Sequence, residues 1–177
     1  MTQERSGTVA FKGNPLTLLG PEIKVGAKAP AFTVRKGLTP DGVYTLETER
    51  GKTRILNIVP SLDTKVCDLQ TRRFNEEAGR LGEAVSIVTL SMDLPPAQER
   101  WCAAAGVERL VMASDYYDHS FGLTYGLRIK ELGLLTRTVM ILDADDTIRY
   151  VQIVPDIAEL PNFDAVLVAA KSVMEEG

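Results

Sequence analysis

Two cysteines, a threonine and an arginine are the residues of this chain with the clearest chemical potential. Cys67 ends the segment Pro60–Cys67, which follows an apolar run and lies at the expected start of a helix. The first turn of a helix has unpaired backbone N–H groups and a positive dipole end, which favour an anion. A thiol in such a position can have its pKa lowered from about 8.5 to about 3.5–7.5, and the thiolate is the nucleophile. The pattern therefore indicates nucleophilic thiol chemistry, although free cysteines are also common as inert buried residues.

Two further residues bear on this chemistry. Thr64 precedes Cys67 by three residues, so both side chains are expected on one face of the helix start. Its hydroxyl can donate to a thiolate or accept a hydrogen bond from an incoming O–H group. Cys102 stands 35 residues after Cys67, a spacing that excludes a Cys-x-x-Cys dithiol. Two isolated thiols indicate either chance or a reversible bridge, and composition alone favours chance.

The segments around these residues predict alternating strands and helices. Residues 54–59 form an almost continuous apolar run, which is typical of a strand covered on both faces. Pro60 ends the run, and a helix capped by Ser61, Asp63 or Thr64 is expected to follow. This helix is expected to end at Gly82, and a strand at 84–90 follows it.

A second helix is expected to open at Asp93 and Pro95 and to stop at Gly106. Its apolar stripe consists of Leu94, Ala97, Trp101 and Ala104 or Ala105. The remaining elements are expected as a strand at 110–113, a helical turn at 120–125, strands at 138–142 and 148–153, and an amphipathic helix from Phe163 to Met174. The strands at 138–142 and 148–153 are joined by a polar turn that contains Asp143, Asp145 and Asp146.

The order of these elements predicts the fold class. Short β-prone runs at 8–12 and 16–19 indicate an N-terminal hairpin within an extension at 1–20. The alternating strands and helices that follow favour an α/β domain with a mixed central β-sheet and helices on both faces. We expect a thioredoxin-like fold in which residues 1–177 form a single domain.

Composition narrows the class of protein. The 177 residues carry a net charge of -4 with 24 acidic and 20 basic residues, which argues against nucleic acid or an anionic membrane as a partner. No apolar stretch approaches the ~18 residues of a membrane span, and the first residues lack the apolar core of a signal peptide. Two cysteines and one histidine are too few for a Cys/His zinc site. These features predict a soluble, cytoplasmic protein without a metal.

Four sequence blocks resemble those of the thiol peroxidases, the bacterial branch of the atypical two-cysteine peroxiredoxins. The similarity runs from about residue 9 to residue 173, in order and with compatible spacing. The four matching blocks are Gly26-x-x-Ala29-Pro30-x-Phe32, Asn57-Ile58-Val59-Pro60-Ser61-Leu62-Asp63-Thr64-x-Val66-Cys67, Ser91-x-Asp93-Leu94-Pro95-x-Ala97-Gln98-x-Arg100-Trp101-Cys102 and Gly133-Leu134-Leu135-Thr136-Arg137.

The resemblance implies a role for each site residue. Cys67 aligns with the peroxidatic cysteine and Cys102 with the resolving cysteine, which would form an intrachain disulfide. Thr64 and Arg137 align with residues that activate the peroxide, and Pro60 aligns with the proline that shields the site. The resemblance also implies a cycle without a cofactor, a hydroperoxide substrate, recycling by thioredoxin or a similar dithiol reductant, and a homodimer.

The implied disulfide makes a structural demand, because its Cα atoms must lie within about 7 Å of each other. We therefore expect local unwinding at Cys67, at the Cys102 segment or at both. One departure from the family lies beside Cys102, where Trp101 occupies a position at which phenylalanine is expected. An apolar approach around Phe32, Val59 and residues 116–127 would favour alkyl hydroperoxides over hydrogen peroxide, and Tyr116, Tyr117 and residues 123–127 are candidates for a dimer surface.

Two other functions fit the same residues. In a one-cysteine peroxidase, Cys102 would be structural, and replacing it would leave turnover intact. In a thioredoxin-fold redox sensor or binding protein, Cys67 would oxidise slowly and signal through a partner. Thr64 and Arg137 together count against the sensor, because a passive sensor has no need to polarise an O–O bond.

Overall fold

A computed structural model describes residues 1–176 of the chain. The strands are β1 (Glu4–Phe11), β2 (Asn14–Leu19), β3 (Thr33–Arg35), β4 (Val43–Thr45), β5 (Thr53–Ile58), β6 (Val85–Ser91), β7 (Val111–Ser114), β8 (Arg128–Ile129), β9 (Thr138–Leu142) and β10 (Ile148–Ile153). The helices are α1 (Lys65–Leu81), α2 (Pro95–Ala105), α3 (Ser120–Thr124) and α4 (Phe163–Glu176). The strands and helices predicted from the sequence are all present, with ends that shift by a few residues.

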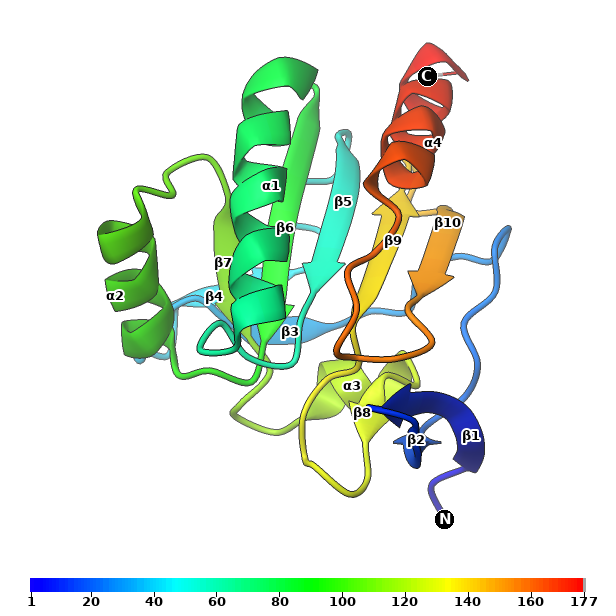
Figure 1. Ribbon diagram of the computed structural model, residues 1–177. Coiled ribbons are helices and arrows are strands. Elements are labelled where there is room, and N and C mark those ends of the chain that lie inside the picture. Colours follow the sequence, from blue (N-terminus) through cyan, green and yellow to red (C-terminus); the bar gives the residue numbers. More distant parts are fainter. Residues whose placement is uncertain (177) are drawn as a thin grey trace.

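A seven-stranded mixed sheet forms the centre of the fold, with the order β10-β9-β5-β6-β7-β3-β4 (Figure 1). Strand β5 lies inside it, parallel to β6 and antiparallel to β9, and each of its residues is buried. This confirms that the apolar run before Pro60 is a strand covered on both faces. The predicted α/β class with a mixed central sheet is likewise confirmed.

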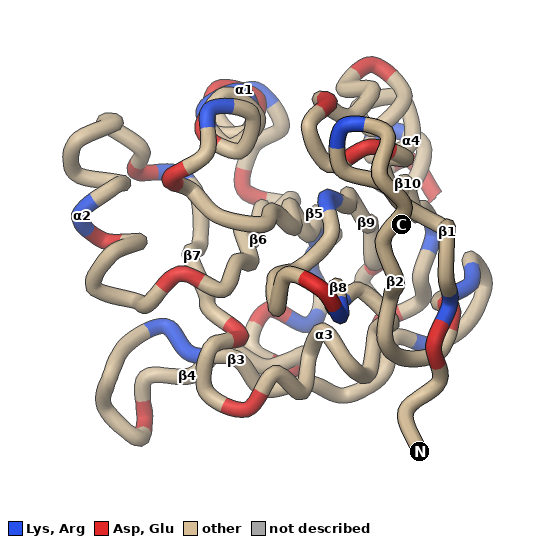
Figure 2. The backbone as a smooth tube through the Cα atoms, turned by 60° about the horizontal axis from the view of Figure 1, so that its bottom comes forward, with Lys and Arg blue, Asp and Glu red and all other residues tan. Residues whose placement is uncertain are grey.

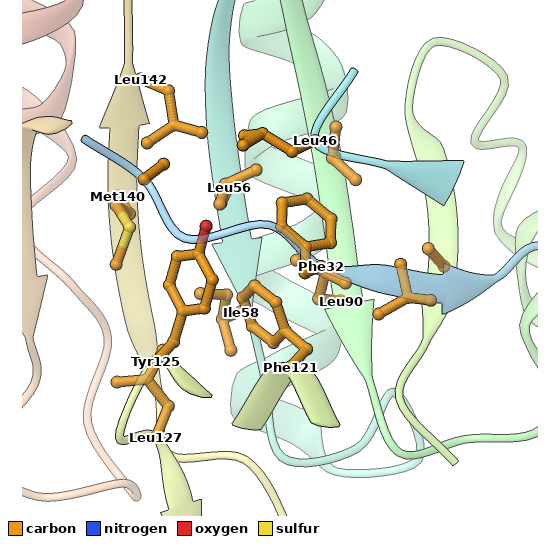
Figure 3. Packing of buried hydrophobic residues seen from close by; sticks show 14 of the residues in the cluster. Phe32, Leu46, Leu56, Ile58, Leu90, Phe121, Tyr125, Leu127, Met140 and Leu142 are labelled. Atoms are coloured by element: carbon orange, nitrogen blue, oxygen red, sulfur yellow. The ribbon is translucent and has the colours of Figure 1, made fainter. Parts of the chain in front are cut away.

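Helices cover both faces of the sheet. The two long helices, α1 and α4, pack on one face through Phe74, Val166 and Ala170 (Figure 1). The short helix α3 and the segment around Phe32 cover the other face, where Phe121 and Tyr125 stack on each other and meet Phe32 edge to face (Figure 3). Aromatic side chains thus supply on this face the apolar area that long helices supply on the other.

The N-terminal hairpin is confirmed, and it is longer than the sequence predicts. Strands β1 and β2 pair antiparallel and join β8 in a separate three-stranded sheet. The turn lies at Lys12 and Gly13, whose positive φ angles of 49° and 83° suit a tight hairpin turn. Asn14 and Pro15, which lie between the two predicted runs, belong to β2 and pair with Phe11 and Ala10.

Two helices depart from the predictions in one detail each. The predicted N-cap position of Thr64 in α1 is confirmed, but its side chain makes no capping hydrogen bond to the helix, and its hydroxyl donates to the Ser61 carbonyl at 2.9 Å. The predicted apolar stripe of α2 includes Leu94, which is 53% exposed, whereas the fully buried positions of the helix are Pro95 and Gln98. The amide of Gln98 can be buried in place of an apolar side chain because it donates hydrogen bonds to the Ser91 hydroxyl and the Ala113 carbonyl.

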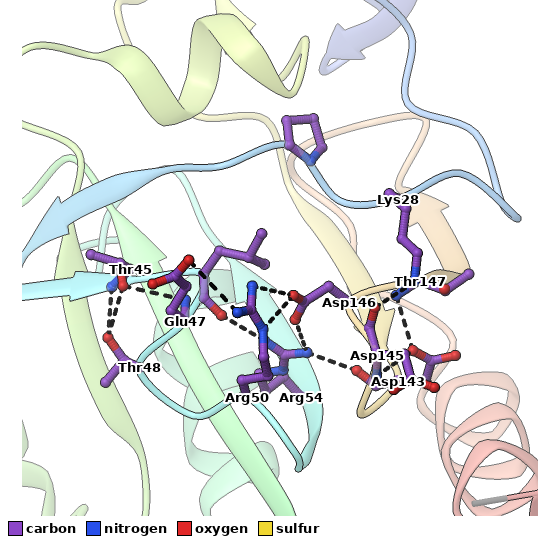
Figure 4. A network of polar contacts seen from close by, with 12 residues as sticks. Lys28, Thr45, Glu47, Thr48, Arg50, Arg54, Asp143, Asp145, Asp146 and Thr147 are labelled. Atoms are coloured by element: carbon purple, nitrogen blue, oxygen red, sulfur yellow. Dashed lines mark hydrogen bonds and ion pairs between the residues drawn. The ribbon is translucent and has the colours of Figure 1, made fainter.

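The polar turn between β9 and β10 contains a buried ion pair that the sequence pattern does not reveal. Arg54 of β5 is 1% exposed, and its Nη2 donates to Asp146 Oδ1 at 2.6 Å (Figure 4). Arg50 also donates to Asp146, at 2.8 Å. Burial alone would raise the pKa of Asp146, but hydrogen bonds from the two arginines outweigh burial and hold the pKa below its usual value.

We expect the Asp146→Asn variant to be less stable than the native chain by about 3 kcal/mol at pH 7, because Arg54 loses its buried counter-charge. Asparagine tolerates the positive φ of 64° at this position, so the backbone is preserved. The native carboxylate stabilises the fold above its unfolded pKa of about 3.9, and this contribution is lost as the pH falls through its lower folded pKa. Denaturant unfolding should therefore show a difference in the free energy of unfolding between the two proteins at pH 7, and this difference should disappear in acid. The adjacent exposed Asp145→Asn variant should have the same free energy of unfolding as the native chain at pH 7 and in acid.

Charged residues are distributed over the whole backbone. Lys and Arg alternate with Asp and Glu in the view of Figure 2, without one long basic stretch. Among residues 1–176, no helix combines the length and apolar character needed to cross a membrane.

Candidate active site

The first turn of α1 holds Cys67 at the edge of the central sheet. Pro60 lacks an N–H group and ends β5, and the chain turns there into the helix. Cys67 is the third residue of α1 and is completely buried, packed against Val59 and Leu62. Its predicted position at the start of a helix, beyond the carboxyl end of a central strand, is confirmed.

Arg137 lies directly against the sulfur of Cys67. Its Nη2 donates to Sγ at 3.2 Å, and the side chain is 1% exposed. Nε and Nη2 also donate to the Ile157 carbonyl at 3.0 and 2.7 Å, and Nη1 donates to Gln70 Oε1 at 2.8 Å. The guanidinium is always cationic in proteins, so this fixed contact can stabilise negative charge that develops beside the sulfur.

Strand pairing explains why two residues 70 positions apart meet here. Strand β9 is antiparallel to β5, with Thr138 opposite Ile58. Arg137, the residue before β9, therefore lies at the same end of the strands as the segment that leads from β5 to Cys67.

A chain of buried amides supports Arg137 from the side of α1. Gln70, one turn after Cys67, donates from Nε2 to Asn57 Oδ1 at 2.5 Å. Asn57 in turn donates to the Thr89 hydroxyl at 3.0 Å. The side-chain groups of Gln70, Asn57 and Thr89 are all hydrogen-bonded to one another or to Arg137, so this network can hold Gln70, and through it Arg137, in one orientation.

The N-terminal hairpin supports Arg137 from the opposite side. The Ile157 N–H donates to the Ala10 carbonyl at 2.9 Å, and the Ala10 N–H donates to the Pro155 carbonyl at 2.8 Å. The Asp156 carboxylate accepts hydrogen bonds from the two backbone N–H groups of the hairpin turn. The hairpin thereby fixes the loop whose Ile157 carbonyl holds the guanidinium.

Thr64 and Pro60 lie beside this pair. Both line the pocket that Arg137 lines. Thr64 is exposed, and because its hydroxyl donates to the Ser61 carbonyl, its oxygen lone pairs are available to an incoming O–H group. Pro60 is buried.

The pocket next to the thiol has a volume of about 430 Å³ and a largely apolar wall. Its wall comes from four separate parts of the chain: the hairpin tip, the start of α1, the loop after β8 and the loop after β10. The lining residues are Phe11, Lys12, Pro60, Thr64, Lys65, Val66, Leu132, Leu134, Arg137, Ile157 and Ala158.

The apolar approach predicted from the sequence is therefore wrong in its residues. Phe32, Phe121 and Tyr125 belong to the core on the other face of the sheet, and Val59 is fully buried. Residues 123–127 are also mostly buried, which leaves only Tyr117 of the predicted dimer surface strongly exposed. The apolar residues at the site instead come from the hairpin tip, from the start of α1 and from the loops that follow β8 and β10.

Cys102 lies near the carboxyl end of α2 and is half-buried. Burial raises the pKa of its thiol. Both cysteines are free thiols. Asp93 joins the loop that leads into α2 to the loop that precedes Cys67: its carboxylate accepts hydrogen bonds from the Ser61 hydroxyl at 2.7 Å and from the Leu62 N–H at 2.9 Å.

Nothing in the described residues is arranged as a metal centre. Over residues 1–176, no three His, Cys, Asp or Glu side chains lie together in a way that could hold a metal ion. The side chains that meet at the reacting position are the Cys67 sulfur and the Arg137 guanidinium, with the Thr64 hydroxyl in the adjoining pocket wall.

Comparison with known proteins identifies the family. Residues 24–167 match the Redoxin family model. The chain belongs to the Redoxin family. The thiol peroxidase of Halalkalibacterium halodurans is 49% identical over 168 residues, which cover 94% of this chain and 99% of that one. The thiol peroxidase of Bacillus subtilis is 45% identical over 167 residues, which cover 94% and 98%. The resemblance to thiol peroxidases is thus confirmed, and this Redoxin chain is an enzyme of the peroxiredoxin type.

Solved structures of Redoxin relatives have the same fold. A peroxiredoxin-like protein from Aquifex aeolicus superposes with a TM-score of 0.86 at 38% identity, covering 97% of this chain and 98% of that one. A thiol peroxidase from Chromobacterium violaceum superposes with a TM-score of 0.82 over 96% and 98% of the two chains, but at 16% identity. The second likeness concerns the fold alone.

Several residues at the site of this Redoxin chain are missed by sequence reasoning. Gln70 lies on the same face of α1 as Cys67, three residues later, and this spacing could have indicated a neighbour of the sulfur. Ile157 acts through its backbone carbonyl, and Phe11 lies on a distant hairpin, so neither gives a signal in the local sequence.

Proposed function

We propose that this chain reduces hydroperoxides through a two-cysteine cycle that needs no cofactor. The Cys67 thiolate attacks one oxygen of the O–O bond, which forms an S–O bond and breaks the O–O bond. The leaving oxygen departs as an alkoxide or hydroxide and takes up a proton, giving an alcohol or water. Cys67 is oxidised to a sulfenic acid, and the peroxide is reduced by two electrons.

Arg137 and Thr64 supply the stabilisation that a thiolate alone lacks. Only contacts that are stronger in the transition state than in the ground state accelerate the chemical step, so the residues around the sulfur must act there. The guanidinium beside Sγ stabilises the negative charge that grows on the leaving oxygen. The Thr64 hydroxyl accepts a hydrogen bond from the peroxide O–H and orients the O–O bond. Pro60, buried at the pocket wall, limits access of water and of a second peroxide molecule to the sulfenic acid.

Cys102 resolves the sulfenic acid in the second step. Its thiolate attacks Sγ of Cys67, an S–S bond forms and the S–O bond breaks, and the hydroxide released takes up a proton to give water. Burial raises the pKa of Cys102 in the present conformation, so its activation requires a change around α2. This matches the local unwinding expected from disulfide geometry.

A dithiol reductant of the thioredoxin type then reduces the disulfide and restores both thiols. Such a cycle operates in a reducing compartment such as the cytoplasm, where structural disulfides are rare and dithiol reductants are present. A homodimer stays a prediction of the family resemblance.

The apolar pocket beside the thiol supports alkyl hydroperoxides as the preferred substrates. An organic substituent can bury its surface against Phe11, Val66 and Leu132, whereas hydrogen peroxide gains nothing from these contacts. This preference was predicted from other residues, and the pocket wall gives it a different physical basis.

The contact between Arg137 and the Cys67 sulfur is the observation that carries the proposal. Its test is a coupled assay in which the protein, thioredoxin, thioredoxin reductase and NADPH are mixed with cumene hydroperoxide or hydrogen peroxide. We expect sustained NADPH oxidation with both substrates and a higher kcat/KM for cumene hydroperoxide by about tenfold, as burial of its apolar group provides. Absence of turnover with either peroxide would contradict the proposed activity.

A further inference from the structure

Trp101 connects the two helices that carry the cysteines. Its Nε1 donates to Asp68 Oδ1 at 2.9 Å, and these two residues are the sequence neighbours of Cys102 and Cys67. Arg72 completes the group, because its Nε donates to Asp68 Oδ2 at 2.8 Å and its guanidinium lies 5.7 Å from the centre of the Trp101 ring. We call Asp68, Arg72 and Trp101 the α1–α2 contact.

The amino-terminal half of α2 is anchored without this contact. Pro95 and Gln98 are buried, and Gln98 Nε2 donates to the Ala113 carbonyl at 2.8 Å and to the Ser91 hydroxyl at 3.0 Å. Asp93, just before the helix, is bonded to the loop that precedes Cys67. These interactions fix the first half of α2 to the sheet and to the start of the site.

The carboxyl-terminal half of α2, which carries Cys102, is held differently. In the described part of the chain, its hydrogen bonds to other elements are the one from Trp101 to Asp68 and a longer one, 3.3 Å, from Arg72 to the Ala105 carbonyl. Ala103 and Ala104 are exposed, so they add no packing. Besides the packing of the Trp101 ring against Val59, Leu62 and Cys67, the α1–α2 contact is therefore the main restraint on the segment that must move.

We propose that Trp101 and Asp68 are positioning residues for the second step of the cycle, and that release of their hydrogen bond limits the rate at which Cys102 reaches the oxidised Cys67. The inference rests on the two-cysteine cycle proposed above and assigns the timing of its disulfide step. The two thiols are free in this conformation, and formation of the S–S bond with loss of water requires the Cα atoms to come within about 7 Å. Because the restraint joins α1 to α2 beside both cysteines, it must break or shift before that approach.

The decisive variant is Trp101→Phe, which keeps an aromatic ring against the Val59–Leu62–Cys67 cluster but removes the N–H donor. Rapid acid quench and mass spectrometry should separate two rate constants: one for oxygen addition to Cys67, proportional to peroxide concentration, and one for disulfide formation, independent of it. We expect disulfide formation to be faster by about tenfold, which corresponds to about 1.4 kcal/mol, with oxygen addition unchanged. Sulfinic acid formation at high peroxide should fall, because the sulfenic acid persists for less time.

A double-mutant cycle with Asp68→Ala isolates the hydrogen bond from other effects of each residue. Trp101→Phe should accelerate disulfide formation in the native background and have little further effect in the Asp68→Ala background. The exposed neighbour Arg100→Gln serves as the matched control and should behave as the native protein. Should Trp101→Phe fold poorly, Asp68→Ala alone must still speed the disulfide step.

Two failures are distinguishable. If the native protein forms no Cys67–Cys102 disulfide, the proposed cycle is wrong. If the native protein forms the disulfide and Trp101→Phe forms it at the same rate or more slowly, the cycle stands and the positioning role of Trp101 and Asp68 is overturned. The chain has a single tryptophan, so native fluorescence gives an independent signal that should change during disulfide formation and not during oxygen addition.

Discussion

Replacing Arg137 by lysine is expected to slow the reaction of Cys67 with hydroperoxide by about 10²–10³-fold, the loss typical of removing one transition-state donor. Lysine keeps the positive charge but lacks the planar fork that binds Ile157, Gln70 and the sulfur together. A single ammonium group cannot reach the Ile157 carbonyl, Gln70 Oε1 and the sulfur at the same time. The measurement is the second-order rate constant for oxygen addition to Cys67, followed by stopped-flow with cumene hydroperoxide.

The control for this prediction is Arg54→Lys. Arg54 and Arg137 are both fully buried arginines, so each replacement perturbs the interior to a similar degree. Arg54 contacts Asp146 and not the thiol, and its variant is expected to lose stability while it keeps its rate. A rate for Arg137→Lys that equals the native rate would show that the guanidinium does not act on the reacting atoms.

Cys102→Ser is expected to convert a cycling enzyme into one that consumes about one equivalent of hydroperoxide per chain and then stops, as a burst without turnover. Serine cannot form the disulfide that thioredoxin reduces, whereas the first step at Cys67 does not use Cys102. Because Cys102 is only half-buried, the exchange of sulfur for oxygen should leave the fold intact. NADPH oxidation in the thioredoxin-coupled assay measures turnover, and rapid mixing measures the burst.

The opposite result has a definite meaning. Sustained turnover of Cys102→Ser with thioredoxin would favour the one-cysteine peroxidase, in which Cys102 is structural. Absence of any burst in the native protein would instead favour the redox sensor or binding protein.

The central elements of the fold were predictable because their patterns are local. The buried strand β5, the proline that ends it and the helix that begins near Cys67 follow from an apolar run and a helix-breaking residue in adjacent positions. The hairpin of β9 and β10 follows from two apolar runs around a polar turn. Such signals need only a window of a few residues.

The environment of the sulfur was less predictable because it depends on strand pairing. Arg137 meets Cys67 only because β9 runs antiparallel beside β5, and no local pattern identifies the neighbour of a strand. Family resemblance, and not residue type, singled out Arg137 in the sequence. The same limit applies to Ile157, whose carbonyl could belong to any residue type.

The apolar surroundings of the site were predicted with the wrong residues for a similar reason. Phe32 precedes the first short strand of the sheet and is apolar, as an approach to the thiol would require, but it packs on the face away from α1. The residues that do line the pocket come from a hairpin tip and from loops, where sequence carries little information on position. Leu132 is 42% exposed, and its sequence context does not distinguish it from an ordinary surface residue. Only the fold of the loop after β8 brings it into the pocket wall.

The most direct test of the account is mass spectrometry of the reduced protein, seconds after addition of equimolar cumene hydroperoxide, followed by peptide mapping under non-reducing conditions. The account predicts loss of two hydrogens and a cross-link between Cys67 and Cys102 of the same chain. A stable added oxygen on Cys67, with Cys102 still a free thiol, would contradict the two-cysteine cycle.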